Sequence, residues 1–174
     1  MYRLHCSPDL PDPPGAACLE RLAAVARRTL SCHCAGGSVD VILTGDAEVR
    51  RLNRTFRGRD RATDVLSFSF VDGDHRDGGD HQDGGDEANA EGKFLAEQDM
   101  PAGEVYISVE RAAAQGEELG VPRDEELARL LVHGLLHLAG YDHQTEADLQ
   151  TMEVLTDELL GSSVPPIRPG GRIY

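Results

Sequence analysis

The chain has 174 residues, of which 40% are hydrophobic and none is tryptophan, and this predicts a single globular domain with an aliphatic core. Its first residues include no basic segment followed by an apolar run, and no later apolar run approaches the roughly 18 residues of a membrane helix. We therefore expect a cytoplasmic protein without a membrane segment. The four cysteines fit that compartment as free thiols: Cys6, Cys18, Cys32 and Cys34.

The net charge of −14 is unevenly distributed along the sequence. Residues 72–99 hold ten acidic and two basic side chains and so contribute −8, which leaves −6 for the rest. Between residues 50 and 61 only Asp60 opposes a group of arginines, which are Arg50, Arg51, Arg54, Arg57, Arg59 and Arg61. Because this local patch is basic, the acidic total does not exclude a nucleic-acid partner.

Hydrophobic periodicity predicts five elements before the acidic segment. In chain order they are a short strand at 2–5, a helix at 17–30, a strand at 39–44, a helix at 47–56 and a strand at 65–71. In the second helix, Val49, Leu52 and Phe56 share one face. Gly58 is expected to end that helix, because glycine readily takes the left-handed conformation.

An acidic segment separates the strand at 65–71 from the next predicted strand, at 104–109. Alternation places Leu66, Phe68 and Phe70 on one side of the earlier strand. The Asp-Gly repeats of residues 72–99 cannot bury enough apolar surface to offset the entropy of ordering, so we expect a disordered insertion. A solvated linker is favoured over a cation site, because no window follows the spacing of a calcium-binding loop.

Three helices are predicted after the insertion, at 111–119, at 125–139 and from Thr145 through Leu159. The helix at 125–139 is apolar nearly all round, which is typical of a buried helix. Thr145 and Asp148 form a capping-box pattern at the start of the last helix. We expect residues 1–160 to form one domain and residues 161–174, rich in Gly and Pro, to form a flexible tail.

Three histidines lie in and just after the predicted buried helix. His133 and His137 are one helical turn apart on one face, where two imidazoles can bind one metal ion. Gly140 can end the helix in the left-handed conformation and let the chain bring His143 back towards the pair. Three separately satisfied core histidines are less favourable, because burying several imidazoles without a shared purpose leaves hydrogen bonds unmet. Three protein ligands with an open fourth position are typical of catalytic zinc.

Three other features have weaker metal or catalytic interpretations. Cys32-His33-Cys34 has one residue between its thiols, where zinc ligands usually have two to four, so a helix end is favoured. Zinc peptidases with His-Glu-x-x-His-x-x-Gly-x-x-His share the histidine spacing, but Gly134 replaces their Glu base, which disfavours peptide hydrolysis. Asp142 is either a carboxylate that orients a metal ligand or a turn former.

Three blocks of the sequence together resemble one family. They are HGLLHLAGYDH at 133–143, LNRTFRGRDRATDVLSFSF at 52–70 and, more weakly, GEVYIS at 103–108. These blocks are similar to the patterns of the YbeY family, metal-dependent endoribonucleases of ribosomal RNA maturation, and the resemblance covers residues 39–160 apart from the insertion. Ala62 and Ser69 stand where the family commonly has Pro, which changes backbone stiffness and leaves the chemistry untouched. Glu104 keeps the acid of the family's Gly-Asp.

The resemblance implies an α+β, zincin-like fold, in which a mixed sheet of about four strands packs with helices around a central histidine helix. It also implies that His133, His137 and His143 hold one Zn²⁺ ion and that Arg57 is the functional arginine. Zinc lowers the pKa of a bound water to about 7 and polarises phosphate, and a guanidinium binds phosphate through paired donors. The expected function is a zinc-dependent, single-strand endoribonuclease in ribosomal RNA maturation and ribosome quality control.

Two alternative functions remain open from the sequence. The first is a zinc-stabilised ribosome-assembly factor that acts by docking, and the second is a zinc peptidase that lacks the usual Glu base. The open coordination position favours the nuclease over the docking factor. The expected partners are ribosomal RNA and the small ribosomal subunit, with a ribosomal protein or an assembly GTPase as a further partner. Neither a membrane nor a small organic cofactor is expected.

Overall fold

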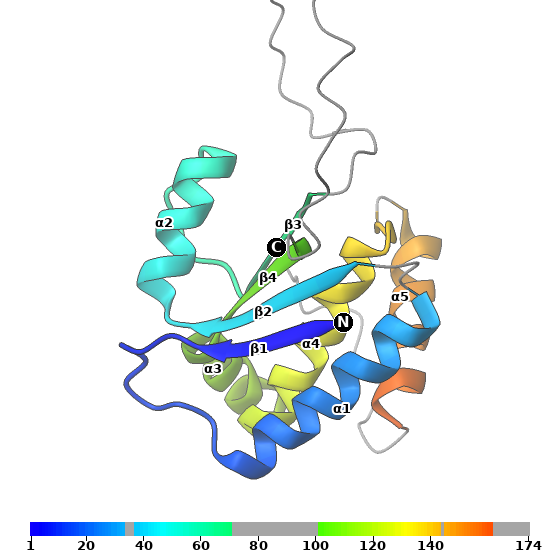
Figure 1. The fold of residues 1–174 in the computed structure, drawn as a ribbon, viewed down its shortest axis with the longest axis horizontal. Helices are drawn as coiled ribbons and strands as arrows, with labels where there is room; N and C mark the ends of the chain where they lie inside the picture. The colour runs from blue at the N-terminus through cyan, green and yellow to red at the C-terminus, as the bar shows by residue number, and fades with distance from the viewer. Residues whose placement is uncertain (34–36, 71–100, 144, 162–174) are drawn as a thin grey trace, which may run out of the picture.

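The structure is a computed structural model that describes residues 1–33, 37–70, 101–143 and 145–161 (Figure 1). Within these ranges the chain forms four strands and five helices. In chain order they are β1 (Tyr2–Cys6), α1 (Ala16–His33), β2 (Ser38–Thr44), α2 (Asp46–Arg57), β3 (Val65–Ser69), β4 (Pro101–Ser108), α3 (Val109–Leu119), α4 (Arg123–Leu138) and α5 (Glu146–Leu160). Every predicted element is present, and the α+β class is confirmed.

The four strands form one mixed sheet in the order β1-β2-β4-β3. β1, β2 and β4 are parallel, and β3 runs antiparallel to β4 at the edge. The side chains of Val41, Leu43, Val105 and Ile107 are fully buried on one face of the central strands. Val, Leu and Ile at alternate positions are typical of strands that have one face covered by helices.

Helix α4 lies at the centre of the helical layer, as the sequence predicts. It packs against α1, α3 and α5 and against strands β3 and β4. Ten of its 16 residues are buried, because its sequence is apolar on nearly every side. Figure 1 shows α1, α4 and α5 together on one side of the sheet, and α2 on the other side.

Helix α2 covers part of the opposite face with a small apolar cluster. Val49 and Leu52 of the helix pack with Leu66 of β3, and Phe68 lies against this cluster. Phe56 belongs to the same helical face, yet 65% of it remains exposed. The small cluster therefore covers this face only partly, and one aromatic ring is left in solvent.

Predicted and observed element boundaries agree to within about three residues, and two of the differences have a local reason. Val109 begins α3 instead of ending β4, because the Ser108 side chain accepts a hydrogen bond from the Arg111 main-chain N–H and caps the helix. β3 ends at Ser69, and Phe70 beyond it is 50% exposed. The capping box of Thr145 and Asp148 is confirmed at the start of α5.

Several predictions fall on segments that the structure does not describe. They concern the acidic insertion at 72–99, the tail after Gly161 and the thiol of Cys34. Among the described helices, none combines the length and the apolar character needed to cross a lipid bilayer.

Candidate metal centre

The end of α4 brings the three predicted histidines together. Gly140 adopts the left-handed conformation with φ 88°, its N–H donates to the carbonyl of His137, and the N–H of Tyr141 donates to the carbonyl of Leu136. This pair of bonds is the Schellman pattern that ends a helix and reverses the chain. The turn places His143 beside the helical pair, as the sequence predicts.

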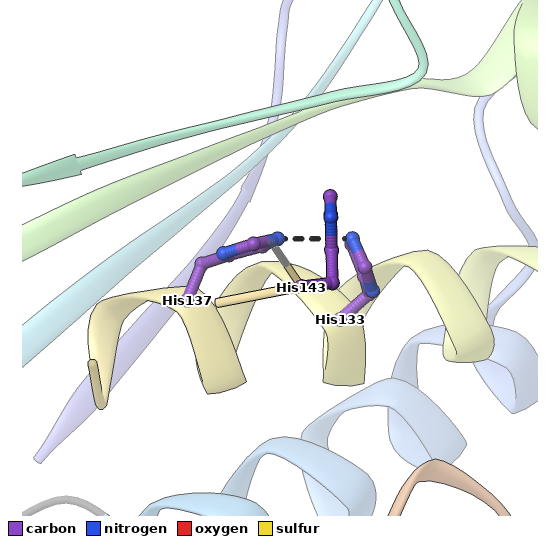
Figure 2. Close-up of side chains that lie close together, drawn as sticks. All are labelled: His133, His137 and His143. Atoms are coloured by element: carbon purple, nitrogen blue, oxygen red, sulfur yellow. Dashed lines mark hydrogen bonds between the residues drawn. The ribbon is translucent and has the colours of Figure 1, made fainter. Parts of the chain in front are cut away.

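The three imidazoles meet at one point, as Figure 2 shows. One ring nitrogen from each of His133, His137 and His143 lies within 4.8 Å of the others. The Nε2 atoms of His133 and His137 are 3.1 Å apart, close to the roughly 3.3 Å between two nitrogens bound to one tetrahedral zinc. The donor set therefore fits a divalent metal ion that binds imidazole.

The electrostatic environment favours the neutral form of His133 and His137, which are largely enclosed by the protein. Burial, followed by the neighbouring His137 and His143, lowers the pKa of His133 to about 4, and the carboxylate of Asp64 opposes this shift. The pKa of His137 is lowered by burial and by His143. A neutral imidazole is the form that binds a metal, so both side chains are ready to coordinate at pH 7 without losing a proton.

A cavity of about 610 Å³ opens over the histidine group. Three arginines that follow one another closely in the sequence line the same cavity: Arg57, Arg59 and Arg61. Nη2 of Arg57 lies 3.5 Å from the carbonyl oxygen of Ser67 on β3. Among the described residues, none of these three arginines has a carboxylate partner, so their charges are available to an anion.

Other arginines of the predicted basic patch have different surroundings. Arg50 binds the carboxylate of Asp60 through Nε and Nη2 at 2.8 and 2.9 Å. Arg51 binds Glu48 in the same two-bonded manner at 2.7 and 2.8 Å. Neither lines the cavity, and Arg54 does not line it either, so the six arginines divide into three at the cavity and three others on α2, two of which are paired with carboxylates.

Asp64 lines the cavity and received no role from the sequence. Only 5% of it is exposed, and its Oδ1 accepts hydrogen bonds from the Val65 main chain and the Thr63 hydroxyl. Its Oδ2 accepts a bond of 3.0 Å from the Gln115 side chain. The sequence shows only that this aspartate directly precedes a predicted strand, whereas its burial, and so its need for such partners, is visible in the structure alone. Its negative charge acts on His133, where it opposes the lowering of the pKa of the imidazole.

Side-chain contacts also help to hold the loop from Gly140 to His143. Oδ1 of Asp142 accepts a hydrogen bond of 2.8 Å from the main-chain N–H of His143, which is the turn-forming contact expected of Asp at this place. The carboxylate also opposes the lowering of the pKa of His137 that burial and His143 cause. At the other side, the Tyr141 hydroxyl lies 3.2 Å from Nδ1 of His33, which links the loop to the end of α1.

Gly134 lies where α4 approaches the sheet most closely. A Cβ atom there would lie 2.6 Å from Cγ1 of Val105 and 3.0 Å from Cγ2 of Val65. No side chain fits this position without a shift, because real Cβ contacts are not so short. The position that carries Glu in the zinc peptidases is therefore occupied here by the contact between helix and sheet.

Comparison with known proteins shows which family the chain resembles over most of its length. The profile of the family described as "Endoribonuclease YbeY" matches residues 16–163. A protein named Endoribonuclease YbeY from Roseiflexus castenholzii is 39% identical over 156 residues, which cover 85% of each chain. One of the same name from Desulfitobacterium hafniense is 41% identical over 123 residues, covering 71% of this chain and 69% of its own. A solution structure from Thermotoga maritima superposes with a TM-score of 0.54 at 26% identity and covers 92% of this chain and 90% of its own.

Proposed function

The chain belongs to the YbeY family of endoribonucleases, and from this premise we propose that it is a zinc-dependent endoribonuclease that cuts single-stranded ribosomal RNA during maturation and ribosome quality control. One observation carries the proposal: the three-histidine group and three arginines without carboxylate partners among the described residues line the same cavity. A metal centre beside free guanidinium groups suits a phosphodiester, which is an anion that must be both bound and activated.

Each group at the cavity has a chemical role in this proposal. His133, His137 and His143 would hold the ion through one ring nitrogen each, and a site with three protein ligands would leave room for water or substrate. A bound zinc ion supplies a water of lowered pKa and a Lewis acid that polarises a phosphate oxygen. The guanidinium of Arg57 binds a phosphate oxygen pair through its planar fork and orients the phosphate towards the histidines.

Arg57 provides the test that separates phosphate recognition from metal binding. Arg57→Ala should keep the zinc content of the wild type and lose at least tenfold in RNA cleavage, which is about 1.4 kcal/mol of transition-state stabilisation. Arg57→Lys should recover only part of the rate, because a lysine lacks the planar fork. The measurements are metal analysis of the purified variants and cleavage of a single-stranded oligoribonucleotide, with and without chelator.

Arg50→Ala is the matched control for this experiment. Arg50 lies on the same helix, is exposed and is already paired with Asp60 outside the cavity. Its removal should leave the cleavage rate near that of the wild type and change RNA binding only in a salt-dependent way. If Arg57→Ala held zinc and cleaved RNA at the wild-type rate, the catalytic assignment would be wrong, and a zinc-stabilised factor that docks to the ribosome would be favoured.

The proposed setting is the cytoplasm, with ribosomal RNA and the small ribosomal subunit as partners and a ribosomal protein or an assembly GTPase as further ones. The support for it is the family membership together with the site, because both point to an RNA phosphodiester. Cleavage of precursor ribosomal RNA within immature small subunits, compared with the same RNA free in solution, tests this setting directly.

A further inference from the structure

Two phenylalanines form an exposed aromatic pair beside the cavity. The ring centroids of Phe56, from the last turn of α2, and Phe68, from β3, lie 5.2 Å apart in an edge-to-face arrangement. Phe56 is 65% exposed, whereas Phe68 is half-buried against the cluster of Val49, Leu52 and Leu66. Packing in the small cluster therefore holds Phe68, and Phe68 in turn supports one edge of a ring that faces solvent.

The aromatic pair is directly connected to the arginine that lines the cavity. Phe56 precedes Arg57 on α2, and Ser67 precedes Phe68 on β3. Arg57 reaches the main-chain oxygen of Ser67, while the ring of Phe56 contacts the ring of Phe68. The dipeptides Phe56-Arg57 and Ser67-Phe68 thus provide both a cation at the cavity and an aromatic surface beside it.

The edge strand β3 separates the two features. The Ser67 hydroxyl points to α4, where it donates to the carbonyl of Gly134, and successive side chains of a strand point to opposite faces. Phe68 accordingly faces α2, across the edge strand from the histidines. Because β3 is the last strand of the sheet, a flexible ligand can pass from the cavity over this edge.

We propose that Phe56, supported by Phe68, is a stacking site for one unpaired base of the RNA whose phosphate binds at Arg57. This inference rests on the proposed function. Single-stranded nucleic acids are bound by a positively charged groove together with aromatic side chains on which bases stack. The base and the phosphates of a nucleotide are joined through one ribose, so an aromatic ring next to a phosphate-binding arginine suits one nucleotide or two neighbouring ones.

The site favours single strands for a physical reason. A base in a duplex is stacked between its neighbours and its faces are not free, whereas an unpaired base can be splayed onto a protein ring. A ring that is already held in place loses little conformational entropy on binding, because an aromatic side chain has only two rotatable bonds. The charge of the three cavity arginines complements the backbone of the same RNA strand.

The test uses a short single-stranded oligoribonucleotide in which one position at a time carries an abasic ribose or the fluorescent base 2-aminopurine. With the zinc-loaded wild type, fluorescence of one position should be quenched by stacking, and an abasic residue there should weaken binding at least about fivefold. In Phe56→Ala the intact oligonucleotide should bind at least about fivefold more weakly, and the abasic change should have no additional effect. Phe56→Trp should keep the quenching that the wild type shows. Phe56→Leu, which is apolar but has no aromatic ring, should lose it.

Phe70→Ala is the matched control, because Phe70 is also exposed and makes no ring contact with a described residue. It should bind the intact and abasic oligonucleotides as the wild type does, and all variants should keep the zinc content and the thermal unfolding temperature.

The possible contrary outcomes are distinguishable. If the wild type cleaves the RNA but Phe56→Ala binds both oligonucleotides as the wild type does, the stacking site is wrong although the nuclease function is supported, and a protein partner for the aromatic pair is favoured. An equal loss in Phe70→Ala would also overturn the assignment to Phe56. If the wild type neither binds nor cleaves the RNA, the proposed function fails, and this inference fails with it.

Discussion

The Ser67 hydroxyl on β3 donates a hydrogen bond of 3.0 Å to the main-chain carbonyl oxygen of Gly134 on α4. This contact joins the edge strand to the helix one residue after His133. It exists because Gly134 has no side chain: an added Cβ would lie 3.2 Å from that same hydroxyl oxygen and 2.6 Å from Cγ1 of Val105. The distance between the sheet and the metal-binding helix is therefore set at this glycine.

Gly134→Ala should destabilise the protein, although Ala is a better helix former than Gly by about 1 kcal/mol. The added carbon must displace the buried Val105 side chain or move α4, and overpacking of this kind costs typically about 1–3 kcal/mol. Urea unfolding measures the loss, and zinc titration should show weaker binding if the helix moves.

Gly15→Ala serves as its control, because nothing lies within 4 Å of a carbon added there. Its free energy of unfolding should change by less than about 1 kcal/mol. Wild-type stability and zinc affinity in Gly134→Ala would mean that α4 can move away from the sheet without consequence for the site.

Periodicity and spacing predicted the part of the site that is local in sequence. The i, i+4 pair of His133 and His137, and the left-handed turn at Gly140 that returns His143, depend only on helix geometry and on a glycine signal. The sequence also showed that Gly134 stands where zinc peptidases carry their Glu base. The packing of Gly134 against Val105, however, depends on contacts between residues that are distant in the chain. Such contacts are not encoded in any short window.

The same limit applies to side chains whose role depends on what lies opposite them. Alternation placed Phe68 and Phe70 on one face of a strand, and helical spacing put Phe56 with Leu52, but neither pattern states how far α2 covers the sheet. Phe56 is 65% exposed and Phe70 50% exposed for that reason. The buried carboxylate of Asp64 likewise depends on a hydrogen bond from Gln115, which is 51 residues away in the sequence.

His137→Ala should reduce bound metal and lower the thermal unfolding temperature of the zinc-loaded protein, because a ligand that binds only the folded state stabilises it by mass action. At free zinc about 1,000 times above its dissociation constant, this stabilisation amounts to about 4.1 kcal/mol. A chelator should lower the unfolding temperature of the wild type and leave that of His137→Ala nearly unchanged.

His5→Ala on β1 is the control for the metal prediction, since His5 is exposed and does not line the cavity. It should bind zinc and respond to chelator as the wild type does. Full metal content in His137→Ala would disprove the three-histidine site.

The metal-free protein should lose stability as the pH falls from about 6.5 to about 4. Burial, together with the neighbouring His137 and His143, lowers the pKa of His133 from 6.5 to about 4 in the folded state, so within this window the unfolded chain binds a proton that the folded chain does not. His133 is thus neutral in both states above the window, and the penalty grows through it to at most on the order of 3 kcal/mol. Urea unfolding at several pH values measures the slope.

His133→Gln is the comparison for the pH experiment, because glutamine has no proton to gain. The slope of its unfolding free energy between pH 6.5 and 4 should be clearly smaller than that of the wild type. Equal slopes in the two proteins would mean that His133 is solvated and titrates normally, contrary to its burial.

A buried ion pair lies one turn before His133 on α4. Nε of Arg129 is 3.3 Å from Oε2 of Glu126, and the two side chains are only 5% and 3% exposed. The contact lacks hydrogen-bond geometry: among the described residues, neither of these atoms has a hydrogen-bond partner, nor does Nη1 of Arg129. Burial raises the pKa of Glu126, and the positive charge of Arg129 opposes that shift.

Because the pair is buried and incompletely bonded, we expect removal of one charge to lower the free energy of unfolding and removal of both charges to leave it nearly unchanged. Arg129→Met leaves the Glu126 carboxylate buried without its counter-charge and should destabilise the protein by about 3–5 kcal/mol near pH 7. The loss should shrink at lower pH, where the carboxylate of this variant becomes neutral. The double variant Glu126→Leu with Arg129→Met removes both charges and should be at least as stable as the wild type within about 1 kcal/mol. Urea unfolding of the metal-free proteins measures all three, and a double variant as unstable as Arg129→Met would show that the ion pair itself, despite its incomplete bonding, holds α4 in place.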